Sequence, residues 1–329
     1  MALAVHLLLA HADEDWLAGL CARLPAGVRL TTGPGLPDVA DYHILVAGRP
    51  TRAQIEASPN LRALIVPWAG IPESTRELML EFPGIAVHNL HHNAQPVAEL
   101  VMALLLAAAK GIVPLDRSLR ADDWTPRYQP SRTLLLSGKT ALVLGYGAIG
   151  RIVARLCRGL GLEVIATRRQ AAVPPQRDAE GTLVAPAAML HDLLPRTDAL
   201  LVCVPHTPDT TGLIGAEELA LLPAHAVLVN IARGPVVDEA ALYHALRERT
   251  IHAAGLDVWY HYPDSEEARA HTPPSAYPFH ELDNVVMSPH RGGASTETER
   301  LRLEHLAVLL NAAAQGEPLP NRVDLGAGY

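Results

Sequence analysis

Residues 141–156 read ALVLGYGAIGRIVARL, and this stretch decides the fold. Four apolar residues, typical of a buried strand, run into a turn of three glycines, and an apolar stripe at helical spacing follows. In such a turn the first glycine allows the tight bend, the second lets the backbone approach a pyrophosphate, and the third lets the helix pack on the strand. The N-terminus of the helix then offers N–H groups and a positive dipole end to phosphates. Because the turn joins a strand to a helix, we predict a dinucleotide site formed by Gly145, Tyr146, Gly147, Ala148, Ile149 and Gly150.

Around this turn, short apolar runs alternate with helical patterns in two series. In the first series the expected strands are 4–10, 42–48, 61–70 and 84–90, and the expected helices are 13–24, 51–57 and 73–82. In the second series the expected strands are 140–145, 162–167, 199–205, 226–232, 253–258 and 284–290, and the expected helices are 149–160, 187–194, 215–222 and 238–248. Longer helices are expected at 95–111 and 295–315, the second capped by Ser295 and Thr296. Strands that are apolar throughout are covered on both faces, so the predicted fold class is α/β with two doubly wound parallel sheets.

Composition limits the partners of this protein. A chain of 329 residues is long enough for two domains, and its net charge of −8 argues against a nucleic-acid partner. The run MALAVHLLLA lacks the basic start of a signal peptide, and no apolar run reaches the roughly 18 residues that span a bilayer, so we expect no membrane partner. Three distant cysteines form neither a disulfide framework nor a metal-binding spacing, which favours the cytoplasm. His88, His91 and His92 have no cysteine or acidic cluster beside them, and no metal site is predicted.

The end of the strand at 162–167 indicates which dinucleotide binds. An Asp or Glu about 20 residues after the glycines would bind the ribose 2′-hydroxyl of NAD. This chain reads IATRRQ there and has no carboxylate. Guanidinium groups bind phosphate through paired hydrogen bonds, so we predict NADP(H), with NAD as the alternative. Arg168 and Arg169 would contact the 2′-phosphate, assisted by Thr167; the competing interpretation is two solvated arginines on a loop.

Six stretches occur in a familiar order: HNLHHNAQPVAELVMALLLA, GYGAIG, CVPHTPDTTGLI, NIARGPVVDEAAL, AGLDVW and MSPHRGG. Over about residues 60–315 the chain resembles the D-isomer-specific 2-hydroxyacid dehydrogenase family, and in particular its glyoxylate/hydroxypyruvate reductase members. The resemblance implies a flavodoxin-like substrate domain of residues 1–95 and 295–329. It implies a Rossmann cofactor domain of residues 96–294 inserted into it, with a cleft between the two. It also implies a homodimer.

The resemblance also implies roles for individual residues. Arg233 would bind the substrate carboxylate and polarise the carbonyl, and His290 would be the acid/base. Asp257 would lie near the nicotinamide. The substrate is a small 2-keto or 2-hydroxy acid, whose carboxylate would meet the amides of Trp68, Ala69 and Gly70. Further cofactor contacts are implied for Val204, Pro205, Thr210, Ile231, Ala232, Asp257 and Gly292.

One position departs from the family pattern. Where the family has a glutamate that pairs with the histidine, this chain has Tyr262. A carboxylate beside His290 would raise the pKa of the imidazole, and a phenol supplies much less of that shift. In one interpretation Tyr262 replaces the glutamate, and the activity of the enzyme is then greatest at lower pH. In the other, a carboxylate from a rearranged loop reaches the histidine, and the candidates are Glu266, Glu267 and Glu281.

Two further alternatives stay open. The Tyr-, His- and Pro-rich segment 259–279 either helps to form the substrate pocket or is a surface loop. The protein could also be a dinucleotide-sensing binding protein, like corepressors of this fold. Retention of both Arg233 and His290 favours the dehydrogenase, since a sensor needs neither.

Overall fold

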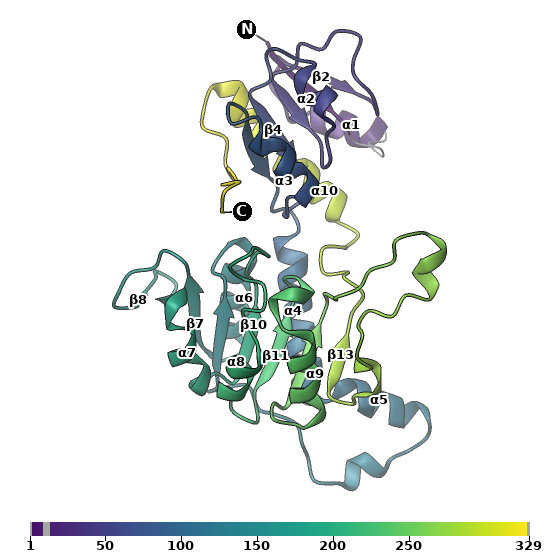
Figure 1. Ribbon diagram of the computed structural model, residues 1–329, viewed down its shortest axis with the longest axis vertical. Helices are drawn as coiled ribbons and strands as arrows, with labels where there is room; N and C mark the ends of the chain where they lie inside the picture. The colour runs from purple at the N-terminus through teal and green to yellow at the C-terminus, as the bar shows by residue number, and fades with distance from the viewer. Residues whose placement is uncertain (1, 9–13, 328–329) are drawn as a thin grey trace. The chain divides into compact units, whose positions relative to one another are not determined.

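The protein forms two compact units, seen here in a computed structural model that describes residues 2–8 and 14–327. Unit 1 comprises Met1–Asn93 and Ala294–Tyr329, and unit 2 comprises Ala94–Gly293. Unit 2 is therefore inserted in sequence between the two segments of unit 1. Each unit contains its own parallel sheet with helices packed on it, which confirms the predicted α/β class (Figure 1).

Unit 1 is built on five parallel strands in the order β2-β1-β3-β4-β5, the order of flavodoxin-like folds. The strands are β1 (Leu3–Leu7), β2 (Val28–Thr32), β3 (Ile44–Val46), β4 (Ala63–Val66) and β5 (Ala86–Asn89). The helices are α1 (Glu14–Cys21), α2 (Arg52–Glu56), α3 (Glu73–Leu80) and α10 (Thr298–Gln315). The apolar pattern does not predict β2, because VRLTT is a partly exposed edge strand. Part of the strand expected at 4–10, and the first residue of the helix expected at 13–24, lie outside the described residues.

The strands of unit 1 supply side chains to both faces of the sheet. Ile44 and Val46 pack with α1 and α10, whereas Leu45 between them packs with α2 and α3. This alternation has the period of two that a strand requires, so a strand with two covered faces must be apolar throughout.

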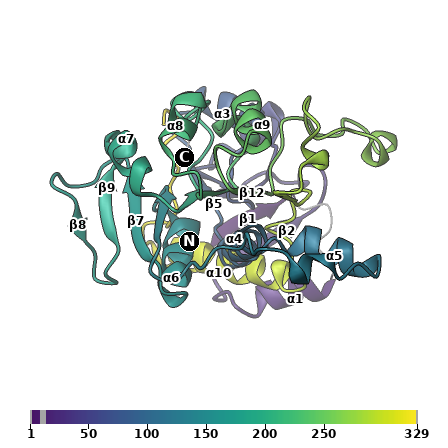
Figure 2. The same cartoon turned by 90° about the horizontal axis from the view of Figure 1, so that it is seen from below.

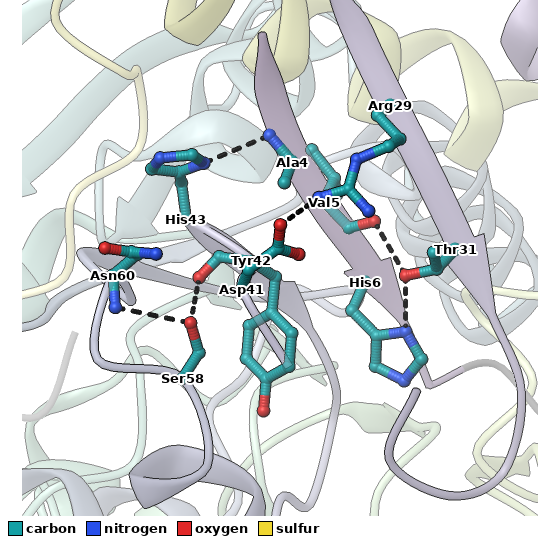
Figure 3. A network of polar contacts seen from close by, with 10 residues as sticks. All are labelled: Ala4, Val5, His6, Arg29, Thr31, Asp41, Tyr42, His43, Ser58 and Asn60. Carbon is teal, nitrogen blue, oxygen red and sulfur yellow. Dashed lines mark hydrogen bonds and ion pairs between the residues drawn. The ribbon is translucent and has the colours of Figure 1, made fainter. Parts of the chain in front are cut away.

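A polar network lies inside unit 1 (Figure 3). The buried His6 places Nε2 2.9 Å from the carbonyl oxygen of Gly35 and Nδ1 2.9 Å from the Thr31 hydroxyl. Because a carbonyl only accepts, Nε2 carries a hydrogen and donates it to Gly35. Nearby, the Ser58 hydroxyl donates to the carbonyl oxygen of Tyr42 at 2.7 Å. The contacts of His6 join β1 to β2 and to the loop after β2, and the contact of Ser58 joins two loops, so these buried polar groups have the partners they need.

Unit 2 is built on eight strands in the order β13-β12-β11-β10-β6-β7-β9-β8, all parallel except β8. The strands are β6 (Thr140–Leu144), β7 (Glu163–Arg168), β8 (Gln176–Arg177), β9 (Leu183–Pro186), β10 (Ala199–Val202), β11 (Val227–Asn230), β12 (Ala253–Leu256) and β13 (Val285–Met287). The α-helices are α4 (Ala94–Lys110), α5 (Ile112–Arg120), α6 (Ala148–Gly159), α7 (Leu190–Leu193), α8 (Ala216–Leu221) and α9 (Glu239–Arg247). Short 3-10 turns occupy 125–128, 187–189, 194–196, 234–236, 267–270 and 279–281.

Helices cover both faces of this sheet. Seen from below, α7, α8 and α9 lie on one side and α4 and α6 on the other (Figure 2). Leu142 and Leu144 of β6 enter the core under the first group, whereas Ala141 and Val143 enter the core under the second. The two cores explain why the strands of the second series are almost free of polar residues.

Three expectations about elements need correction. The helix expected to be capped by Ser295 and Thr296 begins at Thr298, because the Ser295 hydroxyl accepts the N–H of Glu297 in a turn before the helix. The helix expected at 187–194 is broken into short turns. The hairpin of β8 and β9 was not predicted, since β8 has only two residues and β9 only four, too few for a recognisable periodicity.

Helix α5 was also not predicted. It follows α4 after Gly111, whose φ of +59° lets the chain bend by 67° between the two helices. Among residues 2–8 and 14–327, no single helix is long and apolar enough to span a membrane. Only this bent pair, taken together, has such a length and composition.

Candidate active site

The glycine turn is shaped by close backbone contacts. Gly145 has a φ of +95°, and a Cβ there would lie 2.8 Å from the carbonyl oxygen of Cys203. A Cβ on Gly150 would overlap the carbonyl oxygen of Gly145. At Gly147, by contrast, a Cβ would meet nothing within 4 Å. The first and third glycines thus serve the packing of the chain itself, whereas the second leaves free space above the turn.

This free space fits a dinucleotide. The first turn of α6 has no side-chain cap, so its N–H groups are available to a phosphate. The residues that would hold the cofactor are those of the turn, Gly145 to Gly150, together with the residues that follow β7.

The turn lies beside the end of β7. The N–H of Tyr146 donates to the carbonyl oxygen of Thr167 at 3.0 Å, and the Thr167 side chain is buried. Arg168 and Arg169 follow it and are exposed. The Tyr146 hydroxyl donates to Asp178, a carboxylate of the β8–β9 hairpin that the sequence analysis did not single out. Arg168 therefore ends β7 beside the glycine turn and Arg169 follows it, in the place that the sequence analysis expects.

Arg233 follows β11 in a turn that a neighbouring side chain holds in place. The buried Asn230 accepts the N–H of Ala232 and donates to the carbonyl oxygen of Arg233, each at 3.0 Å. A Cβ on Gly234 would overlap the carbonyl oxygen of Trp259, so only glycine fits there. Asn230 was not among the predicted site residues, although its place at the start of the NIARG motif is the signal that could have found it.

Asp257 follows β12 and is only 2% exposed. One of its oxygens accepts the Ser288 hydroxyl at 2.5 Å and the N–H of Arg291 at 2.8 Å, and the other accepts the N–H of Gly292 at 2.9 Å. His290 lies inside this turn with a φ of +57°, a left-handed conformation that costs energy for a residue with a side chain. The Asp257 carboxylate thus stabilises the turn that presents His290. Ser288 is a further residue that the sequence analysis missed.

Tyr262 contacts His290 directly. Its hydroxyl oxygen lies 2.9 Å from Nδ1 of the imidazole and also accepts the N–H of Trp259 at 3.2 Å. Of the proposed carboxylates, Glu266 pairs instead with Arg269 at 2.5 Å, and Glu281 lies 4.0 Å from His280. The structure therefore places the Tyr262 phenol, rather than Glu266 or Glu281, within hydrogen-bonding distance of His290.

Charge and burial determine the protonation of His290. Burial lowers the pKa of this histidine below its usual 6.5, and the positive charge of Arg233 lowers this pKa further. The Asp257 carboxylate acts in the opposite direction. Burial also raises the pKa of Tyr262, so the phenol stays neutral at physiological pH.

The other cofactor residues expected from the resemblance also follow the carboxyl ends of strands. After β10, Thr210 donates to the carbonyl oxygen of Pro205 at 2.8 Å within the loop that contains Val204. Ile231 and Ala232 are buried directly after β11. A Cβ on Gly292 would lie 2.9 Å from Asp257, which explains a glycine there. Ligands of doubly wound sheets bind at this edge.

The loop of Trp68, Ala69 and Gly70 belongs to unit 1 and follows β4. The Trp68 ring lies against Gly48, and the guanidinium of Arg49 lies 5.3 Å from the ring centre. The structure thus gathers the glycine turn, Arg233, Asp257, Tyr262 and His290 in unit 2, and it places 68–70 in unit 1.

Much of the segment 259–279 packs within unit 2. Trp259 and Phe279 are buried, and Tyr277 lies 5.1 Å from the ring of Tyr243 on α9. The Tyr260 hydroxyl donates to the carbonyl oxygen of Val237 at 2.9 Å. The ends of the segment are therefore part of the core beside α9, and its middle is exposed.

The histidines at 88, 91 and 92 belong to unit 1. Nδ1 of the buried His88 donates to the carbonyl oxygen of Pro320 at 2.8 Å. Burial lowers the pKa of His92 to about 4, so this histidine is neutral at physiological pH. No group of three potential metal ligands is present among the residues that the structure describes.

Comparison with known proteins identifies the family. The family model “D-isomer specific 2-hydroxyacid dehydrogenase, NAD binding domain” matches residues 102–292. The chain belongs to the D-isomer-specific 2-hydroxyacid dehydrogenase family. It is 34% identical over 281 residues to a glyoxylate reductase of Korarchaeum cryptofilum, which covers 82% of this chain and 78% of that protein. It is 32% identical over 318 residues to a D-3-phosphoglycerate dehydrogenase of Methanocaldococcus jannaschii, which covers 96% of this chain but only 58% of that longer protein.

Solved structures of this dehydrogenase family share the fold over the whole chain. A D-isomer specific 2-hydroxyacid dehydrogenase from Xanthobacter autotrophicus Py2, in complex with NADPH and MES, is 28% identical, with a TM-score of 0.79 and 100% of both chains covered. An NADPH-dependent glyoxylate/hydroxypyruvate reductase from Sinorhizobium meliloti is 23% identical with a TM-score of 0.76, covering 99% of this chain and 100% of that one, and supports the fold. A nicotinamide dinucleotide is the cofactor of the family, as the glycine turn indicates.

Two glycine substitutions test the cofactor site. Gly147→Ala adds a methyl group into free space, so we expect a thermal unfolding midpoint close to that of the wild type. The methyl group would occupy the position where the backbone approaches the pyrophosphate, and NADPH affinity measured by calorimetry should fall at least tenfold, roughly 1.4 kcal/mol. Gly150→Ala is the contrast, since its overlap with Gly145 should destabilise the fold itself. Wild-type NADPH affinity in Gly147→Ala would show that the dinucleotide binds elsewhere.

Proposed function

We propose that this protein is an NADPH-dependent reductase of small 2-keto acids, which also oxidises the corresponding 2-hydroxy acids. The observation that carries the proposal is the turn of His290, held by Asp257 and contacted by Tyr262, in the same unit as Arg233 and the glycine turn. The glyoxylate reductase name of the relative from Korarchaeum cryptofilum supports this substrate class, and the NADPH bound to the Xanthobacter autotrophicus structure supports the cofactor.

His290 is proposed as the acid that completes the reduction. When bound, the nicotinamide supplies a hydride to the keto carbon, and the carbonyl electron pair moves onto oxygen. The imidazolium of His290 donates its Nε2 proton to that oxygen, which gives the hydroxyl group and leaves the imidazole neutral. In the neutral imidazole Nδ1 keeps its hydrogen, which the oxygen of the Tyr262 hydroxyl can accept, so that Nε2 is free to take a proton back during oxidation.

Arg233 and the loop 68–70 are proposed to bind the substrate. The guanidinium can hold a carboxylate through two parallel hydrogen bonds, and its positive charge favours the negative charge that develops on the carbonyl oxygen. The amides of Trp68, Ala69 and Gly70 would receive the same carboxylate. Unit 1 would then be the substrate domain and unit 2 the cofactor domain.

A substrate panel tests the function. NADPH oxidation should be followed with glyoxylate, hydroxypyruvate, pyruvate, phenylpyruvate and a branched 2-keto acid. We expect turnover of at least one of them, and a loss of at least about 100-fold in kcat for His290→Ala, since acid catalysis contributes about 10²–10⁴. Tight NADPH binding without turnover of any 2-keto acid would refute the reductase and favour a dinucleotide sensor.

The proposed NADPH preference rests on Arg168 and Arg169. The variant Arg168→Ala/Arg169→Ala should raise KM for NADPH by about 10- to 100-fold, because each charge-assisted hydrogen bond contributes about 1.5–3 kcal/mol. KM for NADH should stay within about twofold, since NADH has no 2′-phosphate for these guanidinium groups to bind. Arg247→Ala, an exposed arginine on α9, is the control. An equal loss with both cofactors would contradict the assignment.

Tyr262 leads to a pH prediction. The acid form of His290 is lost as pH rises through a pKa that lies below 6.5, so kcat/KM for reduction should be higher at pH 6 than at pH 8. Tyr262→Glu places a carboxylate beside the imidazole and should move this falling limb upward by about one pH unit or more. Tyr262→Phe, which supplies no charge, should not move it upward. A pH–rate profile that is the same in wild type and Tyr262→Glu would rule out the phenol as the partner of His290 during catalysis.

A homodimer is proposed from the family, and an exposed apolar surface of unit 2 supports it. Ile112, Leu115 and Leu119 of α5 are exposed, as are Trp124 and Tyr128, which follow this helix. Apolar side chains that cluster in this way usually mark an interface. In sedimentation velocity we expect the wild type to be a dimer and Leu119→Glu, which places a charge on this surface, to be a monomer. Val173→Glu, at an exposed position outside this surface, is the control and should remain a dimer. A monomeric wild type would exclude the dimer.

The cysteines support a location in the reducing cytoplasm. All three are free thiols, and Cys157 is buried in the core. Burial raises the pKa of Cys157 to about 12, so this thiol is inert toward disulfide exchange.

A further inference from the structure

The C-terminal tail after α10 pairs with the edge strand of unit 1. Residues 320–325 run beside β5, in yellow at the end of the chain in Figure 1. The N–H of Val323 donates to the carbonyl oxygen of Val87 at 2.8 Å, and Arg322 forms an antiparallel bridge with His88. Further along, Arg76 donates to the carbonyl oxygen of Leu325 at 2.9 Å. The tail therefore covers an edge that would otherwise expose unpaired backbone groups.

Two asparagines join the tail to the end of β5. The N–H of Asn89 donates to the carbonyl oxygen of Asn321 at 3.2 Å, and the side-chain amide of Asn321 donates to the carbonyl oxygen of Asn89, also at 3.2 Å. Asn321 has a φ of +58°, and asparagine tolerates this left-handed conformation better than most residues. The pair fixes the backbone of Asn89 from the side opposite to β4.

Asn89 in turn holds the loop that follows β4. Its side chain is 7% exposed and donates to the carbonyl oxygen of Ala69 at 2.6 Å. The next residue, Leu90, donates its N–H to the carbonyl oxygen of Trp68 at 3.2 Å. Two successive carbonyls of the loop are thus bound by the end of β5.

These two contacts also orient the amides of the loop. A trans peptide is planar, and its C=O and N–H point in opposite directions. The N–H of Ala69 shares a peptide with the carbonyl of Trp68, and the N–H of Gly70 shares one with the carbonyl of Ala69. Because both carbonyls point toward the end of β5, both N–H groups point away from it.

We propose that the C-terminal tail is a positioning element for substrate binding, in which Asn321 holds Asn89 and Asn89 orients the amides of Ala69 and Gly70 toward the substrate carboxylate. This inference rests on the proposed role of the loop 68–70 in carboxylate binding. Neither asparagine is a catalytic residue, since each acts through the loop. The tail keeps its other contacts, through Val323 and Leu325, when the Asn321 side chain is removed.

Two variants separate the side-chain contacts from backbone strain. Asn321→Gly keeps the left-handed conformation at no steric cost and removes the amide that holds Asn89. Asn89→Asp keeps the side-chain shape and replaces the donor to Ala69 with an oxygen. Glu317→Gln, at an exposed position between α10 and the paired part of the tail, is the matched control.

The experiment combines amide hydrogen exchange, read by mass spectrometry on peptides that contain residues 68–71, with steady-state kinetics. In Asn321→Gly and Asn89→Asp we expect exchange in this loop to be faster by about three- to tenfold, the value of one lost hydrogen bond. KM for the 2-keto acid should rise by a similar factor, and KM for NADPH should stay within about twofold. Glu317→Gln should match the wild type in every measurement.

Unchanged exchange in both variants would overturn the inference, because the tail would then not hold the loop. Faster exchange with an unchanged KM for the 2-keto acid would also overturn it, since the loop would not bind the carboxylate. If the wild type reduces no 2-keto acid at all, the proposed function fails, and the exchange data alone decide whether the tail positions the loop.

Discussion

The close approach of three backbone segments at the glycine turn is the constraint on which unit 2 depends. The carbonyl of Gly145 occupies the space where a side chain on Gly150 would lie, and the loop after β10 occupies the space beside Gly145. These contacts bring the start of α6 against β6 and β10 at the carboxyl edge of the sheet. A side chain at Gly150 would overlap the carbonyl oxygen of Gly145, and one at Gly145 would collide with the backbone of Cys203, so either would displace the turn. The packing of the turn therefore depends on the absence of these two Cβ atoms, and the proposed cofactor site depends on the turn.

Two turns at this edge of the sheet are held in place mainly by hydrogen bonds between buried side chains and backbone groups. Asn230 fixes the turn that carries Arg233, and Asp257 fixes the turn that carries His290. Both holding residues are buried, and both use side-chain oxygens to accept N–H groups of the turn they hold. The left-handed conformation of His290 persists because Asp257 compensates for its cost. In unit 1, Asn89 has a comparable arrangement with the loop 68–70, although there it is the carbonyls that are bound.

Tyr262 provides His290 with a neutral hydrogen-bonding partner. The phenol oxygen can accept from Nδ1 of His290 as a carboxylate does, so it can hold the orientation of the ring. It adds no negative charge, and so burial and Arg233 leave the pKa of His290 low. A glutamate would supply both a hydrogen-bond acceptor and a negative charge, whereas Tyr262 supplies only the acceptor.

The sequence by itself determined the fold class, the order of the long elements and the edge of the sheet where the site residues lie. It could do so because apolar strands, helical stripes and glycine turns are local patterns, and because the carboxyl ends of parallel strands share one edge. Only the tertiary structure decided which side chain contacts His290, since the sequence left Tyr262, Glu266, Glu267 and Glu281 open and the path of the loop selects among them. The same holds for Asn230, Ser288 and Asp178, and for the pairing of Asn321 with Asn89 across 232 positions of the chain. Hydrogen bonds between residues so far apart have no periodicity, and they exist only once packing has brought two backbones side by side.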